Sequence, residues 1–338
     1  MMMTWFESVT GIREESPEQV RRELSVDRDC IVCPNGKRIA FGRFETPKLS
    51  ELRTAVAETD AHSGQSRVRE VVGDVRQLHS DVGNANALFQ VASQFNLLEM
   101  AGPSVTPERG VGIYENDHTQ GPTCAIACGA GTIYRNYFVS VPDGGGRNVI
   151  GQSAQWQIDC AADLGRAFAN IDGKLWFMQN GYLFPTDQGL EQITGQLRRA
   201  SESEIDELRG ELRIGFQWDA QVTLPDAEHR VSQAYCSGLP VAYGGHPTEA
   251  WADFAKLILE SAYEATICGA ILNGSLTGVR SVFLTLLGGG VFGNRDEWII
   301  GALERAIEKY LTHDLDIAIV SYRRSKPAVA DLSARFSG

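Results

Sequence analysis

Apolar side chains follow one another along this chain in the patterns of alternating strands and helices. Residues 282–287 are apolar apart from one threonine, which predicts a buried strand. Apolar residues then recur at helical intervals over 296–311, and the same spacing precedes the strand over 249–272. A last apolar run, 315–322, predicts another buried strand. The final third of the chain therefore predicts helices that alternate with parallel strands.

Earlier segments give weaker versions of the same signals. Asn35-Gly36 and Asn180-Gly181 lie between strand-like runs and predict two hairpins. We expect strands at 68–75, 212–218 and 231–243, and helices at 18–24, 47–56, 85–100, 122–138, 159–169, 187–199 and 201–210. The predicted fold class is α/β, a three-layer α/β/α sandwich with a central mixed sheet and added N-terminal and middle segments.

Polar and glycine-rich stretches suggest how the chain is divided. Residues 61–66 are polar, and Gly144-Gly145-Gly146 marks a second break. We expect residues 1–65 to form an N-terminal extension packed on the core. Residues 66–325 would form the core, with an insertion at about 140–245, and residues 326–338 a C-terminal tail.

The net charge of −12 argues against a broad nucleic-acid surface, which needs a basic stripe. A small anion site built from backbone N–H groups stays compatible with an acidic chain. No apolar run reaches the ~20 residues that span a bilayer, and the first residues do not resemble a signal peptide. The expectation is a cytoplasmic protein without a membrane or nucleic-acid partner.

Seven cysteines, an odd number, do not suggest a secreted disulfide framework. Cys30 and Cys33 form a C-x-x-C, and Cys124 and Cys128 are one helical turn apart. Two such pairs could together bind zinc, but about ninety residues separate Cys33 from Cys124. Free and mostly buried thiols are the favoured interpretation, with no metal and no cofactor.

The strand at 282–287 runs directly into Gly288-Gly289-Gly290-Val291-Phe292-Gly293. Glycine allows a tight backbone turn in which N–H groups face an anion. With the helix that follows, this loop is a candidate phosphate cradle. A tight strand-to-helix turn without a ligand is the alternative, because glycine motifs alone give false positives.

Three motifs resemble the signatures of macrodomains in order and spacing. They are Val72-Gly-Asp-Val75, Asp81-Val-Gly-Asn-Ala-Asn86 and Phe283-Leu-Thr-Leu-Leu-Gly-Gly-Gly-Val-Phe-Gly293. Residues 114–122 and 134–138 are similar instead to a divergent branch of arginine-specific ADP-ribosylhydrolases. The resemblance covers roughly residues 66–138 and 248–322, and implies a macrodomain-type sandwich that binds ADP-ribose.

The resemblance also implies a role for individual residues. Asp74 would accept a hydrogen bond from the adenine amino group, and Tyr322 would stack on adenine. Phe292 would lie against the distal ribose, which Asn84 and Asn86 would reach or orient. A solvated turn, core packing and helix capping are the respective alternatives for Asp74, the two aromatic residues and the two asparagines. The N–H groups of Gly288, Gly289, Gly290, Val291 and Gly293 would bind the diphosphate, and Gln90 and Asn294 complete the expected ligand-binding set.

Common macrodomains follow the asparagines with a glycine-rich segment, which this chain lacks at 87–96. The catalytic groups must therefore come from elsewhere, and the polar loop 115–120 is the natural source. In extended backbone Glu115 and Asp117 would point the same way and share one site. We expect Asp117 to be the principal catalytic carboxylate, with Glu115 assisting and Asp219 holding the substrate arginine. A solvated acidic loop is the alternative.

These residues predict an ADP-ribosylhydrolase that removes ADP-ribose from arginine side chains of modified proteins. Its partners would be ADP-ribose and an ADP-ribosylated protein. Two alternatives stay open: a module that binds ADP-ribose without hydrolysing it, and a hydrolase of small ADP-ribose metabolites.

Overall fold

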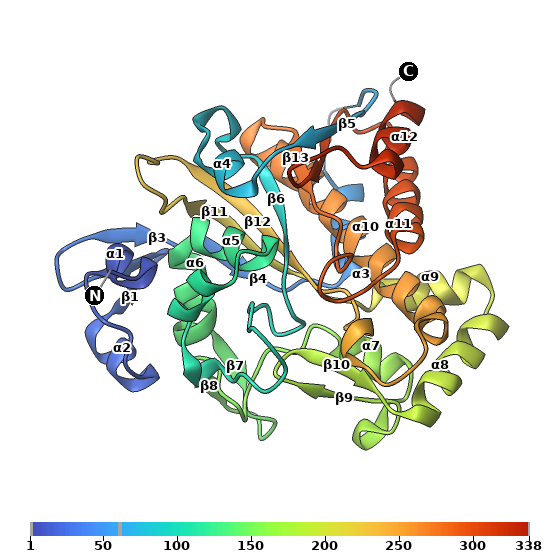
Figure 1. The fold of residues 1–338 in the computed structure, drawn as a ribbon, viewed down its shortest axis with the longest axis horizontal. Coiled ribbons are helices and arrows are strands. Elements are labelled where there is room, and N and C mark those ends of the chain that lie inside the picture. Colours follow the sequence, from blue (N-terminus) through green and yellow to red (C-terminus); the bar gives the residue numbers. More distant parts are fainter. Residues whose placement is uncertain (1–2, 60–62, 337–338) are drawn as a thin grey trace.

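A central sheet of seven strands organises the computed structural model, which describes residues 3–59 and 63–336. Figure 1 shows the sheet between its helices. The strand order is β4 (Arg43–Glu45), β11 (Gly215–Gln221), β12 (Arg230–Cys236), β6 (Leu88–Ala92), β13 (Ser281–Leu284), β14 (Asp316–Ser321) and β5 (Arg67–Val72). Strands β12 to β5 are parallel, and β11 is antiparallel to both neighbours. This confirms the predicted α/β class with a mixed sheet.

Helices cover both faces of the sheet. Helix α10 (Ala252–Thr277) packs on β6, β12 and β13. Helices α11 (Asp296–Lys309) and α3 (Leu49–Ala57) pack against α10. Gln90 of β6 bonds to Thr266 of α10, whereas the neighbouring Phe89 stacks on His79 of α4 (Val75–Ser80) at 3.9 Å. Successive strand residues point to opposite faces, so α4 lies on the other side, where it packs on α5 (Gln120–Ala127). The molecule thus has three layers.

The predicted helix at 85–100 is wrong, because residues 88–92 are the central strand β6. Strands buried on both faces carry near-continuous apolar runs, and such a run matches helical spacing as well as strand spacing. The predicted helix at 122–138 is broken. It consists of α5, α6 (Gly129–Ile133) and a π-turn (Tyr134–Phe138), with Cys128 at a non-helical ψ of 60° between the first two.

Both Asn-Gly hairpins are confirmed. They join β2 (Cys30–Val32) to β3 (Arg38–Ala40), and β9 (Trp176–Gln179) to β10 (Tyr182–Pro185). The remaining elements are α1 (Trp5–Thr10), α2 (Pro17–Glu23), β1 (Ser25–Asp27), β7 (Ser140–Pro142), β8 (Asn148–Ile150), α7 (Ala162–Ala167), α8 (Asp187–Arg199), α9 (Glu202–Gly210) and α12 (Pro327–Arg335). No helix among the described residues is long and apolar enough to cross a membrane.

The central sheet draws on the expected N-terminal extension, the core and the insertion. Strand β4 comes from residues 1–65, and β11 and β12 come from 140–245. Helix α12, in the expected tail, packs on β5 and α11. Of the polar segment 61–66, residues 61 and 62 lie outside the described residues. Ser66 is buried, and its hydroxyl oxygen accepts a hydrogen bond from the Leu315 N–H.

An ion network joins the helices on the α10 face. The fully buried carboxylate of Glu264 accepts hydrogen bonds from Arg53 of α3 and from Arg305 and Lys309 of α11. Burial opposes its ionisation, but these three cations together lower the pKa of Glu264 to about 2.

Candidate active site

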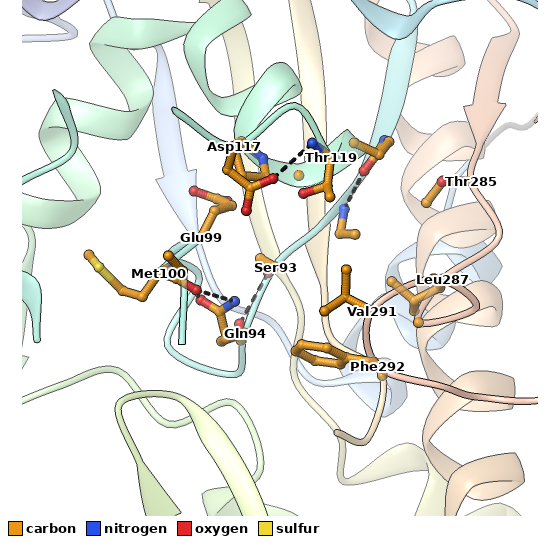
Figure 2. A pocket seen from close by; sticks show the side chains of 18 of the residues that line it. Ser93, Gln94, Glu99, Met100, Asp117, Thr119, Thr285, Leu287, Val291 and Phe292 are labelled. Carbon is orange, nitrogen blue, oxygen red and sulfur yellow. Dashed lines mark hydrogen bonds between the residues drawn. The ribbon is translucent and has the colours of Figure 1, made fainter. Parts of the chain in front are cut away.

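A cavity of about 210 Å³ opens at the carboxyl edge of β6 and β13, the usual place for ligands in parallel α/β sheets. Its walls come from chain segments that are far apart in sequence. They are the residues after β6 (92–94 and 99–101), the loop into α5 (117 and 119–122), the residues after β13 (285–288 and 290–292), and Tyr182, Gly238 and Tyr243. Figure 2 draws Asp117 and Glu99 on one side of this cavity and Phe292 on the other.

The glycine loop after β13 is fixed by its own hydrogen bonds and by Asn294. Gly288 has a φ of +71°, and a Cβ there would lie 2.5 Å from the Asn294 amide nitrogen, so glycine is required. That amide donates to the carbonyls of Leu239 and Gly288. Asn294 is 4% exposed, so it holds the loop from behind and does not face the cavity.

The loop presents unused backbone donors to the cavity. The N–H groups of Gly289 and Gly293 donate within the loop, to Leu286 and Gly290 respectively. Those of Gly288, Gly290, Val291 and Phe292 donate to no acceptor within residues 3–59 and 63–336, and all four residues line the cavity. Clustered free N–H groups of this kind bind anions. Helix α11 adds little, because Asp296 and Glu297 already occupy its first turn.

Asp117 and Glu115 do not share a site, and this part of the prediction is wrong. Residues 112–116 form a 3₁₀ turn, so the extended backbone that would align the two carboxylates is absent. Asp117 lines the cavity, and its Oδ1 accepts from the Thr119 N–H at 2.9 Å. Glu115 faces the other way and accepts from the N–H of Trp5 at 3.0 Å.

The segment that carries Asp117 is anchored to the sheet through Gln120. The Gln120 side chain accepts from the N–H of Ala92 and donates to the carbonyl of Gln90, both at 2.8 Å, and so continues the edge of β6. At Gly121 a Cβ would lie 2.0 Å from the Ala92 carbonyl oxygen, so only glycine allows this approach. The acidic loop is therefore positioned by the central strand itself.

Glu99 is a wall residue that the sequence patterns did not single out. It is 3% exposed, and neither carboxyl oxygen has a hydrogen-bond partner among the described residues. The nearest cation, Arg135, lies 3.9 Å away. Burial raises the pKa of Glu99 to about 8, although Arg135 opposes the shift. One signal was available: Glu99 is the single charge in the run Leu97-Leu98-Glu99-Met100.

Three aromatic rings form another wall. Tyr182 is buried and donates its hydroxyl hydrogen to the Met100 carbonyl at 2.9 Å. Its ring centroid lies 5.5 Å from that of Tyr243 and 5.4 Å from that of Phe292. All three residues line the cavity. The sequence singled out Phe292, as a residue against the distal ribose, whereas Tyr182 and Tyr243 come from residues 140–245, for which it indicated no role.

Two other predicted residues stand at the same edge of the sheet, outside the cavity wall. Asp74 follows β5, and its carboxylate accepts from the N–H of Arg76, which caps α4. Tyr322 follows β14, is 53% exposed, and has the Arg323 guanidinium 4.8 Å from its ring centroid. Parallel pairing of β13, β14 and β5 places both residues on the side of the glycine loop.

Asn84 and Asn86 do not join this edge. They precede β6, whereas the cavity lies beyond its end, so the full length of the strand separates them from the glycine loop. The Asn84 amide donates to the Leu78 carbonyl, and the Asn86 carbonyl accepts from Asn273. Gln90 is also no cavity residue: its buried amide bonds to Thr266 and Thr285.

Asp219 lies at the opposite end of the sheet as well. It belongs to a bulge in β11 that is paired with the amino end of β12. Its exposed carboxylate forms an ion pair with Arg230. The structure therefore does not place it where it could hold a substrate beside Asp117.

The cysteines are free, as predicted: Cys30 is half-buried and the others are buried. Burial raises the pKa of the Cys124 and Cys128 thiols well above the usual range. Within residues 3–59 and 63–336 there is no group of three His, Cys, Asp or Glu side chains arranged to hold a metal ion.

No family model and no curated protein matches this chain. Among solved structures, this chain is similar to poly(ADP-ribose) glycohydrolase from Thermomonospora curvata, with 11% sequence identity and a TM-score of 0.44. The match covers 98% of this chain and 97% of the glycohydrolase chain. The Deinococcus radiodurans glycohydrolase in complex with ADP-ribose is 10% identical, with coverage of 96% and 98% and a TM-score of 0.46. TM-scores below 0.5 are too low to establish a shared fold or function.

Proposed function

We propose that this chain is an ADP-ribosylhydrolase that releases ADP-ribose from arginine side chains of modified proteins. One observation carries the proposal: the four free N–H groups of the glycine loop and the Asp117 carboxylate line a single cavity. A diphosphate is an anion that such donors bind. With the diphosphate on the loop, one nucleoside arm reaches along the sheet edge toward Tyr322 and Asp74, and the distal ribose enters the cavity.

The chemistry follows from what a carboxylate can do at that ribose. The bond from the ribose anomeric carbon to the guanidinium nitrogen breaks through a state with cationic character on the sugar. Asp117 stabilises that charge and takes a proton from the attacking water, whose oxygen forms the new bond to the anomeric carbon. The electron pair of the broken bond stays on the guanidine nitrogen, which recovers the proton from Asp117. The products are ADP-ribose and arginine.

The N–H of Thr119 holds Asp117 for this role by donating to one carboxylate oxygen at 2.9 Å, which leaves the other oxygen for water. The anchorage of Gln120 on β6 keeps the whole loop in place. Such positioning matters because a carboxylate displaced by ~1 Å loses much of its effect.

The test is release of ADP-ribose from proteins modified on arginine, on aspartate or on serine. The wild-type chain is expected to act on the arginine-linked protein. Asp117→Asn should lower that rate about 10²- to 10⁴-fold, the usual contribution of general acid–base catalysis. Glu115→Gln is the matched control, since it removes a carboxylate two residues away that faces Trp5, and it should leave the rate within about twofold.

Absence of release from all three proteins, together with measurable ADP-ribose binding by calorimetry, would make the chain a binding module. Release only from free ADP-ribose metabolites would make it a small-molecule hydrolase.

A further inference from the structure

We infer that the wall formed by Tyr182, Tyr243 and Phe292 is the site that recognises the guanidinium of the substrate arginine, with Asp117 opposite it. This inference rests on the proposed function for the identity of the cation. It assigns a role to residues 182 and 243, which lie in the middle part of the chain.

Of the three rings, those of Tyr243 and Phe292 are partly exposed to solvent, and the buried ring of Tyr182 supports them. Tyr182 is 2% exposed and is fixed by its hydrogen bond to Met100. Tyr243, at 37% exposure, and the partly buried Phe292 rest against it and meet each other at 78°, with centroids 5.8 Å apart. All three residues line the cavity, so this edge-to-face pair and the ring behind it form an aromatic part of its wall.

The backbone holds these two rings as one unit. The N–H of Ala242, next to Tyr243, donates to the carbonyl of Phe292 at 2.9 Å. At Gly293 the φ is +74°, and a Cβ would lie 2.9 Å from that of Ala242, so the two segments touch closely. The segment that carries Tyr243 is therefore joined directly to the glycine loop that would bind the diphosphate.

The charge around the aromatic wall favours a cationic substrate group. Burial raises the pKa of the Tyr243 and Tyr182 phenols, and the negative charge of Asp117 adds to both shifts. Asp117 lines the same cavity as both rings. Aromatic ring faces and a nearby carboxylate attract a flat, weakly hydrated cation such as guanidinium, and offer nothing comparable to the neutral ester or ether linkages of aspartate or serine.

The experiment compares two ADP-ribosylated peptides, one modified on arginine and one on serine, with Tyr243→Leu, Tyr243→Phe and wild type. Tyr243→Leu removes the ring and should lower kcat/KM for the arginine peptide about fivefold to thirtyfold, mainly through KM, with ADP-ribose affinity within about twofold. Tyr243→Phe keeps the ring and should retain the arginine preference. Phe177→Leu, a change at an exposed aromatic residue outside the cavity, is the control for loss of an aromatic surface residue.

Two results would overturn the inference: unchanged arginine preference in Tyr243→Leu, or an equal loss of affinity for ADP-ribose itself. If the wild-type chain hydrolyses neither peptide, the proposed hydrolysis has failed, and the intact peptides then serve as ligands. Their Kd values test the cation site alone, because wild type should bind the arginine peptide more tightly than the serine peptide and Tyr243→Leu should not.

Discussion

The carboxyl of Glu99 and the guanidinium of Arg135 lie 3.9 Å apart, both fully buried, without a hydrogen bond between them. Two of the Arg135 nitrogens bond elsewhere: Nε donates to the carbonyl of Leu97 and Nη2 to the hydroxyl of Thr132, and the guanidinium lies 3.5 Å from the Tyr235 ring centroid. Its Nη1 has no hydrogen-bond partner among the described residues. The pair is too distant to offset the desolvation of Glu99, which therefore favours its neutral form. This buried acid forms part of the wall beside Asp117.

Replacement of Glu99 by glutamine should change how stability depends on pH. Because the pKa of Glu99 is raised from 4.5 to about 8, the folded state binds its proton more tightly than the unfolded state does. The contribution of the Glu99 proton to the free energy of unfolding is fully present below pH 4.5 and is lost as pH rises toward 8. The free energy of unfolding of Glu99→Gln, relative to that of wild type, should therefore rise by up to ~1.4 kcal/mol per pH unit across this window.

Urea unfolding at pH 5, 6.5 and 8 measures the effect. The groups that surround Glu99 and share its environment are Arg135, Tyr114, Tyr235 and Cys124, with Asp117 on the same wall. All of them are present in both proteins, so the difference between the two pH profiles reports on Glu99. Parallel profiles would show that Glu99 is ionised in the folded protein throughout.

Alanine at Gly290 should weaken ADP-ribose binding at least about tenfold without destabilising the fold. A Cβ there meets no protein atom within 4 Å, and it would stand among the free N–H groups where the diphosphate is expected. Gly301→Ala is the matched control, since its Cβ is equally unobstructed but lies on the exposed face of α11.

Calorimetric titration with ADP-ribose gives the affinities, and thermal unfolding gives the stabilities. Gly301→Ala should bind normally and be more stable by roughly 0.5–1 kcal/mol, the gain from alanine inside a helix. Unchanged affinity in Gly290→Ala would remove the glycine loop from the ligand site.

Glutamine at position 264 should destabilise the fold and leave the cavity intact. The change leaves Arg53, Arg305 and Lys309 beside a neutral group, and breaking a buried ion network costs about 3–5 kcal/mol. Because the pKa of Glu264 is lowered to about 2, its contribution is present above pH 4.5 and is lost as pH falls toward 2.

Denaturant unfolding at neutral pH and at pH 3 should therefore show a large deficit that shrinks in acid. Glu202→Gln serves for comparison, since its carboxylate is 72% exposed and its pair with Arg209 should contribute no more than ~1 kcal/mol. A deficit that stayed constant with pH would argue that Glu264 is not the titrating group.

Asparagine at position 219 should leave ADP-ribose release within about twofold of wild type. Asp219 is an exposed partner of Arg230 at the edge of the sheet opposite to the cavity. The same release assay on arginine-modified protein measures it. A large loss of turnover would return Asp219 to the substrate site and require a different arrangement of the chain there.

Local sequence determined those features whose physical cause is local. The two Asn-Gly hairpins depend on residues that tolerate positive φ. The tight turn after β13 depends on Gly288 and Gly293, at φ of +71° and +74°. The long helix at 252–277 and the strand 281–284 follow from apolar periodicity over many residues. These elements, and the position of the glycine loop at the end of a buried strand, were predictable.

Tertiary structure decided whatever depends on neighbours distant in sequence. Residues 88–92 are a strand because β12 and β13 pair with them on either side, which no local periodicity reveals. Glu115 turns away because Trp5 binds it. Glu99 and Tyr243 reach the cavity because long-range packing brings their segments to the edge of β6 and β13. Sequence spacing fixes which side chains share one element, whereas the pairing of elements fixes which side chains share one site.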